Sequence, residues 1–383
     1  MFLLDKPYVS QLLISTIKNN AIPVIDFTEN TTLNSLTTDQ AVDTIVEQKN
    51  PCVYSNSENA IGWINENLAT TPLPEKINLF KDKYKFRLLI KELHPDFFFT
   101  SVSINKLEDL DFKQLPLPFI IKPCVGFFSM GVYKVHTFDE WQKTQKLIRQ
   151  EMQQVKGLYP DSVMGDERFI IEQNINGEEF AVDAYINKQG QAVVLNILKH
   201  TFVSDDDVSD RVYTTSKEII EHNVLEFTEF TQKLADLAGL KNFPMHIELR
   251  RQPNGELIPI EVNPMRFGGW CTTADMAYYA YGFNQYLYYY NQQKPNWHKI
   301  LQGKDDKLYS IIVLDNSSGI NASDIKNFNF EKVLQSFNNV LESRIIDYKS
   351  YPLFGFLFVE TDKKNTRELN NILQSDLSEY IQT

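Results

Sequence analysis

The chain has 383 residues, of which 43% are hydrophobic and 23% charged, and a formal net charge of −12 at pH 7. This length predicts two or three domains, and the composition is typical of a soluble globular protein. The net negative charge disfavours nucleic acid as a partner, because a polyanion binds to a positive surface. Any phosphate that the protein binds must therefore be held by local cations.

Neither the N-terminus nor the interior predicts secretion or a membrane span. The first apolar run stops at Asp5, Lys6 and Pro7, too early for a signal peptide. The aromatic segment YYAYGFNQYLYYY is interrupted by Gly282, so it is not expected to cross a membrane. We expect a cytoplasmic protein. The cysteines are too far apart in sequence for a zinc site and are predicted to be reduced thiols: Cys52, Cys124 and Cys271.

The order of predicted elements indicates a mixed α/β and α+β protein. In residues 1–80, short apolar runs alternate with amphipathic segments, which predicts a small parallel α/β domain. No GxGxxG motif follows the first strand, so NAD binding is not supported. Residues 81–172 predict an α+β subdomain with strands FFFTSVS, FIIKP and VYKVH. Residues 173–300 continue with β-rich runs, a hairpin turn at 188–190 and a helix over 218–239.

Residues 301–383 predict a separate α+β cap. The runs KLYSIIVLD, ESRIIDY and PLFGFLFVE are typical of strands, whereas EKVLQSFNNVL and RELNNILQSDLSEYI have helical patterns. The cap could close a site on the rest of the protein or form the contact of a homodimer. The sequence leaves both alternatives open.

The segment MHIELRRQPNGELIPIEVNP predicts a hairpin that brings two carboxylates together. Asn254-Gly255 predicts a two-residue turn with positive φ at both residues, which places Glu248 opposite Glu261 and aligns Asn263 on the same polar face. Like charges in this position destabilise a sheet and resist ionising together, unless a cation lies between them. Carboxylate and amide oxygens suit Mg²⁺ or Mn²⁺. The alternative is an exposed hairpin with two solvated glutamates.

A second candidate site follows the strand FIIKP. Lys122 ends this strand, and the loop after it contains Gly126, Ser129 and Gly131. Glycines allow the backbone to approach a ligand, so N–H groups of the loop could bind phosphate oxygens beside the lysine charge. The loop lacks the GK[ST] of a Walker motif. A simple hairpin turn with a solvated lysine is the alternative.

Three further features have little meaning in isolation. The strand that ends at Glu172 could present backbone groups to a purine, and Glu179 could accept from ribose hydroxyls, although a plain hairpin explains both. Lys83 and Lys199 would ordinarily be solvated. Arg266, just after the acidic hairpin, suits a carboxylate or phosphoryl oxygen, against the alternative of capping a helix.

In combination, these motifs resemble the ATP-grasp superfamily, which includes D-alanine–D-alanine ligase, biotin carboxylase and many carboxylate–amine ligases. The order is DK, then IIKP with a Gly/Ser loop, then E followed by GEE, then E…ExNP, over about residues 80 to 270. The resemblance implies a two-subdomain ATP-grasp module over residues 81–172 and 173–300, preceded by the α/β domain that commonly accompanies it.

The resemblance also implies roles for individual residues. ATP phosphates would be bound by Lys83, Lys122, the loop of Gly126, Ser129 and Gly131, and Lys199. Adenine would be contacted at Glu172, Gln173 and Ile175, and ribose by Glu179. Two Mg²⁺ ions would be bound by Glu248, Glu261 and Asn263. Arg266 and Lys122 would act in catalysis. His246 stands where D-alanine ligases have arginine, and Met265 where many relatives have one, which disfavours D-alanine ligase activity.

The expected activity is formation of an amide or peptide bond from a carboxylate and an amine, both amino-acid-like, through an acyl phosphate, with release of ADP and phosphate. One alternative is an ATP-dependent phosphotransferase that forms no amide. Another is a nucleotide-binding regulatory protein without turnover. The opposed glutamates argue against the second alternative, because a scaffold has no need of them.

Overall fold

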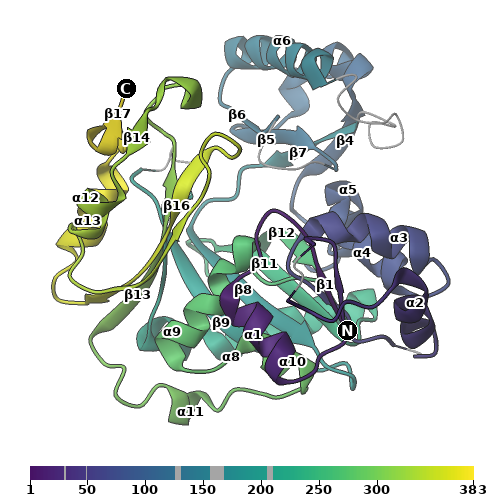
Figure 1. The fold of residues 1–383 in the computed structure, drawn as a ribbon. Coiled ribbons are helices and arrows are strands. Elements are labelled where there is room, and N and C mark those ends of the chain that lie inside the picture. Colours follow the sequence, from purple (N-terminus) through teal and green to yellow (C-terminus); the bar gives the residue numbers. More distant parts are fainter. Residues whose placement is uncertain (30–31, 49, 126–130, 156–167, 205–209) are drawn as a thin grey trace.

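The computed structural model describes residues 1–29, 32–48, 50–125, 131–155, 168–204 and 210–383. The described strands form sheets of three, four and eight strands and a two-stranded ribbon. Figure 1 shows the four-stranded sheet above the central eight-stranded sheet, with the N-terminal and C-terminal parts on opposite sides. The mixed α/β and α+β class predicted from the sequence is confirmed.

The N-terminal part is the predicted parallel α/β unit. Strand β1 lies between β2 and β3 and is parallel to both. The side chains of Ser10 and Thr37 cap the first two helices by accepting backbone N–H groups. The elements are β1 (Phe2–Leu4), α1 (Gln11–Asn19), β2 (Val24–Asp26), α2 (Thr38–Val46), β3 (Tyr54–Ser55), η1 (Glu58–Ala60), α3 (Ile61–Asn67) and α4 (Leu73–Lys81).

The four-stranded sheet is antiparallel, in the order β4-β7-β5-β6. Its core contains Phe119 and the buried Trp141 of α6. Since side chains alternate along a strand, Ile120 and Lys122 face away from that core. The elements are α5 (Lys83–Leu89), β4 (Phe99–Ser103), η2 (Ile104–Asp109), η3 (Phe112–Gln114), β5 (Phe119–Pro123), β6 (Tyr133–Val135), α6 (Phe138–Val155) and β7 (Arg168–Gln173).

The central sheet has the order β12-β11-β8-β9-β10-β13-β16-β15, and neighbouring strands are antiparallel. Its first half comes from residues 178–264, and the predicted hairpin at 188–190 joins β8 to β9. The elements are β8 (Glu178–Ile186), β9 (Ala192–Thr201), β10 (Val212–Thr215), α8 (Lys217–Ala238), β11 (Phe243–Arg251), β12 (Leu257–Pro264), η4 (Gly269–Cys271), α9 (Thr272–Tyr281), α10 (Gln285–Tyr290) and α11 (Trp297–Ile300).

The tyrosine-rich segment that follows β12 is part of the core. Gly282 ends α9 in the left-handed region (φ +73°), so the segment forms two short helices rather than one. Tyr286 and Tyr289 are fully buried and contact Tyr54 of the N-terminal sheet. Among the described residues, no helix is both long and apolar enough to span a bilayer.

The C-terminal residues extend the central sheet and also have a core of their own. Strand β13 pairs with β10, and β16 and β15 follow it. The two predicted helices are shorter than expected. The first ends just before Ser336, whose hydroxyl donates to the Val333 carbonyl, and the second ends before Ser375-Asp376, residues that favour turns over helix. The elements are β13 (Lys307–Asp315), η5 (Ala322–Asp324), β14 (Asn327–Phe328), α12 (Phe330–Leu334), β15 (Val340–Ile345), β16 (Leu353–Asp362), α13 (Arg367–Gln374), η6 (Ser378–Tyr380) and β17 (Ile381–Gln382).

Candidate functional site

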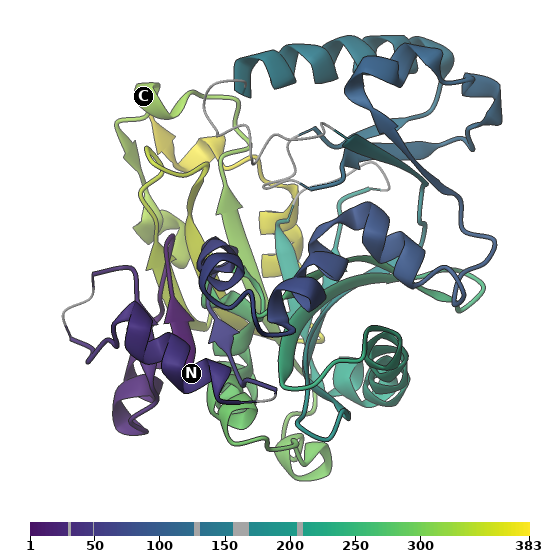
Figure 2. The same ribbon diagram turned by 90° about the vertical axis from the view of Figure 1, so that its right-hand side faces the viewer.

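A cavity of about 570 Å³ is lined by residues of both larger sheets and of the N-terminal unit. Figure 2 shows the four-stranded sheet and α6 above the strands of the central sheet. The cavity brings together most of the residues singled out from the sequence. Those that line it are Lys83, Lys122, Glu172, Gln173, Ile175, Glu179, Glu248, Glu261, Asn263 and Arg266.

Among the described residues, two predicted phosphate-binding residues, Gly131 and Lys199, do not line the cavity. Gly126 and Ser129 lie outside the described part of the chain. Gly131 is described, has a φ of +73°, and lies beside Pro123, where an added Cβ would be 3.3 Å from Pro123 Cγ. Lys199 forms an ion pair with Glu178 at the exposed surface of the central sheet.

The turn of the β11–β12 hairpin differs from the predicted two-residue turn. Gln252 N–H donates to the Glu256 carbonyl (2.8 Å) and Gly255 N–H to the Gln252 carbonyl (2.9 Å), so residues 253–255 form a three-residue loop. Of these three residues only Gly255 has a positive φ, +86°. The prediction of a positive φ at Asn254 was wrong, because Pro253 favours the second position of a type I turn, which a left-handed glycine then follows.

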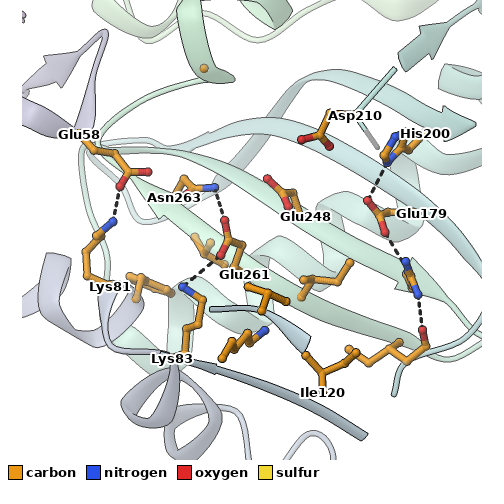
Figure 3. A pocket seen from close by; sticks show the side chains of 18 of the residues that line it. Glu58, Lys81, Lys83, Ile120, Glu179, His200, Asp210, Glu248, Glu261 and Asn263 are labelled. Atoms are coloured by element: carbon orange, nitrogen blue, oxygen red, sulfur yellow. Dashed lines mark hydrogen bonds and ion pairs between the residues drawn. The ribbon is translucent and has the colours of Figure 1, made fainter. Parts of the chain in front are cut away.

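The predicted pairing of the acids is nevertheless confirmed. Glu248 is opposite Glu261 and His246 is opposite Asn263. The three-residue loop shifts the register by one residue, and a β-bulge at Ile260 shifts it back before Glu261. The bulge therefore places both carboxylates on one face of the hairpin, and Figure 3 shows the two side chains in the same cavity.

The two carboxylates have opposite electrostatic surroundings. Burial and the charge of Glu261 raise the pKa of Glu248 well above its usual value. Burial acts in the same direction on Glu261, but Lys83 and Lys122 outweigh it and lower its pKa. Lys83 Nζ is 3.4 Å from Glu261 Oε2, and Asn263 Nδ2 donates to Glu261 Oε1 at 3.2 Å. Glu248 is thus the carboxylate that gains most from a cation.

Lys122 is held on the opposite wall of the cavity by a buried network. Its Nζ is 3.0 Å from Glu172 Oε2, and Arg87 donates to both oxygens of Glu172 at 2.8 and 3.3 Å. Burial favours a raised pKa for Glu172, but the two cations reverse this and lower it to about 2. Both carboxylate oxygens of Glu172 are occupied, so any contact of this residue with adenine is restricted to its backbone.

The segment after β7 is held by a second arginine. Arg250 Nη1 donates to the Ile175 carbonyl (2.5 Å), and Arg250 Nε donates to Glu179 Oε2 (2.8 Å). The second oxygen of Glu179 is 2.9 Å from His200 Nδ1 (Figure 3). His200 in turn stacks on Tyr213, with ring centroids 4.1 Å apart. Glu179 is therefore fixed in orientation at this end of the cavity.

Arg266 lies at the opposite end, beside the N-terminal unit. Its Nε and Nη2 donate to Glu58 Oε1 at 3.1 and 2.8 Å, and Lys81 pairs with the other oxygen of Glu58. Burial is again outweighed by Arg266 and Lys81, which lower the pKa of Glu58 to about 2. Asn56 and Trp270 also line this end. Arg266 is thus oriented by a residue that lies more than 200 positions earlier in the sequence.

This arrangement of opposed acids and cavity-facing lysines agrees with the comparison with known families. Residues 115–274 match the family model described as an ATP-grasp domain. These residues form an ATP-grasp domain. The matched residues begin just before β5, the strand that carries Lys122. They end after β12, the strand that carries Glu261 and Asn263. The sequence comparison with curated proteins finds no match.

Comparison with solved structures extends the likeness to the whole chain. L-amino acid ligase from Bacillus licheniformis superposes with a TM-score of 0.69 at 18% identity, covering 100% of this chain and 97% of that one. N5-carboxyaminoimidazole ribonucleotide synthetase from Thermotoga maritima gives 0.65 at 13% identity, covering 100% and 98%. The biotin carboxylase domain of 2-oxoglutarate carboxylase from Hydrogenobacter thermophilus, solved with MgADP and bicarbonate, gives 0.60 at 12% identity, covering 94% and 86%. The chain therefore has the fold of ATP-grasp ligases.

The oxygen donors of the ATP-grasp domain fit a hard divalent ion. Glu248 and Glu261 supply carboxylate oxygens, and Asn263 keeps its amide oxygen available because its nitrogen donates to Glu261. In the part of the chain that is described, no three His, Cys, Asp or Glu side chains could hold a metal on their own. Phosphate oxygens of a nucleotide would have to complete the shell, as is usual for Mg²⁺.

Several residues of the candidate site were not found from the sequence. Arg87, Glu58 and Arg250 each hold a predicted residue in place, yet none belongs to a recognisable motif. Arg87 lies one helical turn after Lys83, which is the one local signal that the sequence offers. Glu58 is brought to Arg266 by tertiary folding alone.

Proposed function

We propose that this protein is an ATP-dependent ligase that joins a carboxylate to an amine. In this reaction a substrate carboxylate oxygen attacks the γ-phosphorus of ATP and ADP leaves. The amine nitrogen then attacks the acyl carbon, phosphate leaves, and the nitrogen loses a proton. The observation that carries the proposal is the opposed pair Glu248 and Glu261 in the same cavity as Lys83 and Lys122.

The nucleotide would lie between the two sheets. Lys83 and Lys122 would bind its phosphates, together with the loop that contains Gly126, Ser129 and Gly131. Backbone groups at Glu172, Gln173 and Ile175 would contact adenine. Glu179, oriented by His200 and Arg250, would accept from the ribose hydroxyls. The assignment of Lys199 to a phosphate has the least support, because this residue does not line the cavity.

Glu248, Glu261 and Asn263 would hold Mg²⁺ or Mn²⁺, with two ions expected from the family resemblance. Bound divalent ions neutralise the charge of a transferring phosphoryl group. The chain itself contributes the orientation of the acids: the bulge at Ile260 aims Glu261, and Lys83 and Asn263 fix its two oxygens.

The acceptor substrates would bind near Arg266, at the end lined by the N-terminal unit. Arg266 could donate to the oxyanion that forms as the amine adds, a contribution worth about 2.7–4 kcal/mol for a well-aimed donor. Glu58 restrains the guanidinium and would keep it aimed at one position. Ser57 and Asn59 of the N-terminal unit also line the cavity.

The direct test is phosphate and ADP release by the purified protein with Mg²⁺, against pairs drawn from amino acids, polyamines and small acids. The proposal expects release that needs both members of one pair, with an amide as the product by mass spectrometry. A phosphorylated product without an amide would favour a phosphotransferase. Nucleotide binding without turnover across the whole panel would favour a regulatory role.

A further inference from the structure

Arg87 lies outside the matched ATP-grasp residues, yet it connects both walls of the cavity. It belongs to α5 and is only 2% exposed. Its Nε and Nη2 donate to Glu172 of β7, and its Nη1 donates to the Pro259 carbonyl of β12 at 2.8 Å. The guanidinium carbon lies 4.4 Å from the Phe97 ring centroid. A buried arginine with all these partners is fixed in geometry.

On the side of the four-stranded sheet, Arg87 acts on a phosphate-binding candidate. Glu172 accepts from Arg87 through both oxygens and also pairs with Lys122 at 3.0 Å. Lys122 and Glu172 are both buried, so neither partner can be replaced by water without cost. The position of the Lys122 ammonium therefore depends on Glu172, and that of Glu172 on Arg87.

On the side of the central sheet, Arg87 acts at the bulge beside a metal-binding candidate. Leu249 pairs with Pro259 and Glu248 with Glu261, which leaves Ile260 as the extra residue. A bulge frees backbone groups from the ladder and changes the direction of the following side chain. The Pro259 carbonyl, two residues before Glu261, is the acceptor for Arg87.

We propose that Arg87 is a positioning residue that sets Lys122 and Glu261 relative to one another across the nucleotide cavity. This inference rests on the proposed function, because it assumes that both residues act on one bound nucleotide. Arg87 need not touch the nucleotide itself. Its effect passes through Glu172 to Lys122 and through the Pro259 carbonyl to Glu261.

A merely structural arginine would lower stability without a specific dependence on Lys122. The test is therefore a double-mutant cycle on affinity for MgADP, measured by isothermal titration calorimetry with Arg87→Met, Lys122→Met and the double variant. We expect Arg87→Met to weaken binding about tenfold in the natural background and about threefold in the Lys122→Met background, where only the route through the Pro259 carbonyl to Glu261 remains. Arg211→Met is the matched control, because Arg211 is equally buried, pairs with Asp315 and does not itself line the cavity.

Each outcome decides between alternatives. Equal weakening in both backgrounds, or weakening as large in Arg211→Met, would overturn the inference, as would an unchanged affinity in Arg87→Met. If Arg87→Met does not fold, as judged by circular dichroism, the same cycle is run with Arg87→Lys, which keeps the charge but loses the planar fork. If the unaltered protein does not bind MgADP, the proposed function fails and the inference fails with it.

Discussion

Two groups of charged residues in the cavity differ in how the fold brings them together. The acidic pair, Glu248 and Glu261, comes from a single hairpin and carries like charges that repel. The ion pair, Glu58 and Arg266, comes from distant parts of the chain and carries opposite charges that attract. The acidic pair is electrostatically incomplete without a cation, whereas the ion pair is already compensated within the protein. Removing an acid should therefore have opposite effects on stability in the two groups.

The largest expected effect is the loss of turnover when the acidic pair is changed. We predict that Glu261→Gln and Glu248→Gln each lower ADP formation at least about 100-fold, because a divalent ion contributes several kcal/mol to phosphoryl transfer. The measurement is steady-state ADP release with the best substrate pair and saturating Mg²⁺. Glu178→Gln, an exposed acid of the same sheet, is the control. Full activity in both site variants would contradict the assignment of the acidic pair to a divalent ion.

The free energy of unfolding should change in opposite directions when an acid of the ion pair and an acid of the acidic pair are removed. Glu58→Gln leaves Arg266 and Lys81 without their shared partner, and we expect a loss of about 3 kcal/mol in the free energy of unfolding. Glu248→Gln relieves repulsion from Glu261, so it should gain up to about 1 kcal/mol without metal. Urea denaturation of the two variants measures both changes, and a loss in Glu248→Gln would contradict the account.

The Glu172 network adds a pH-dependent prediction. Because the pKa of Glu172 is lowered from 4.5 to about 2, its ionised form stabilises the fold above pH 4.5, and this is lost as the pH falls through about 2. The difference in unfolding free energy between the natural protein and Glu172→Gln should shrink by about 3 kcal/mol from pH 6 to pH 2. Urea titrations at several pH values test this. A difference that stays constant would mean that the carboxylate is not preferentially ionised in the fold.

The smallest expected effect concerns the turn that connects the two strands of the acidic pair, β11 and β12. Gly255→Ala places a Cβ at φ +86°, and we predict a loss of about 1 kcal/mol although no atom obstructs it. Gly62→Ala is the matched control, because Gly62 is helical and its Cβ position is equally open, so this change should be neutral or stabilising. Thermal denaturation compares the two, and equal shifts would count against the three-residue loop.

These contrasts also explain what the sequence could predict. The acid pair was predictable because Glu248 and Glu261 lie on one hairpin, although the predicted turn was one residue too short and a bulge compensated for it. No pattern in the sequence predicts that bulge, or the hydrogen bond that the Pro259 carbonyl accepts from Arg87. The Glu58–Arg266 pair depends on how the N-terminal unit docks through Tyr54 and its aromatic neighbours, which no local pattern encodes.

The C-terminal residues show the same limit. Their strands were predicted from apolar runs, but the pairing of β13 with β10, which merges them into the central sheet, depends on contacts about 100 residues apart. The predicted helices were too long because helical periodicity continues past Leu334 and Gln374, whereas Ser336 and Ser375-Asp376, which follow, favour turns. Periodicity thus located the elements, and side chains that compete for backbone hydrogen bonds set their ends.

The central claim is that Glu248 and Glu261 share a divalent ion with a nucleotide. Crystals grown with Mn²⁺ and ADP, measured at the manganese absorption edge, test it most directly. The account predicts an anomalous peak bound by both carboxylates and by phosphate oxygens between Lys83 and Lys122. Ordered ADP with no manganese at these acids, or with the two side chains turned away from the phosphates, would contradict it.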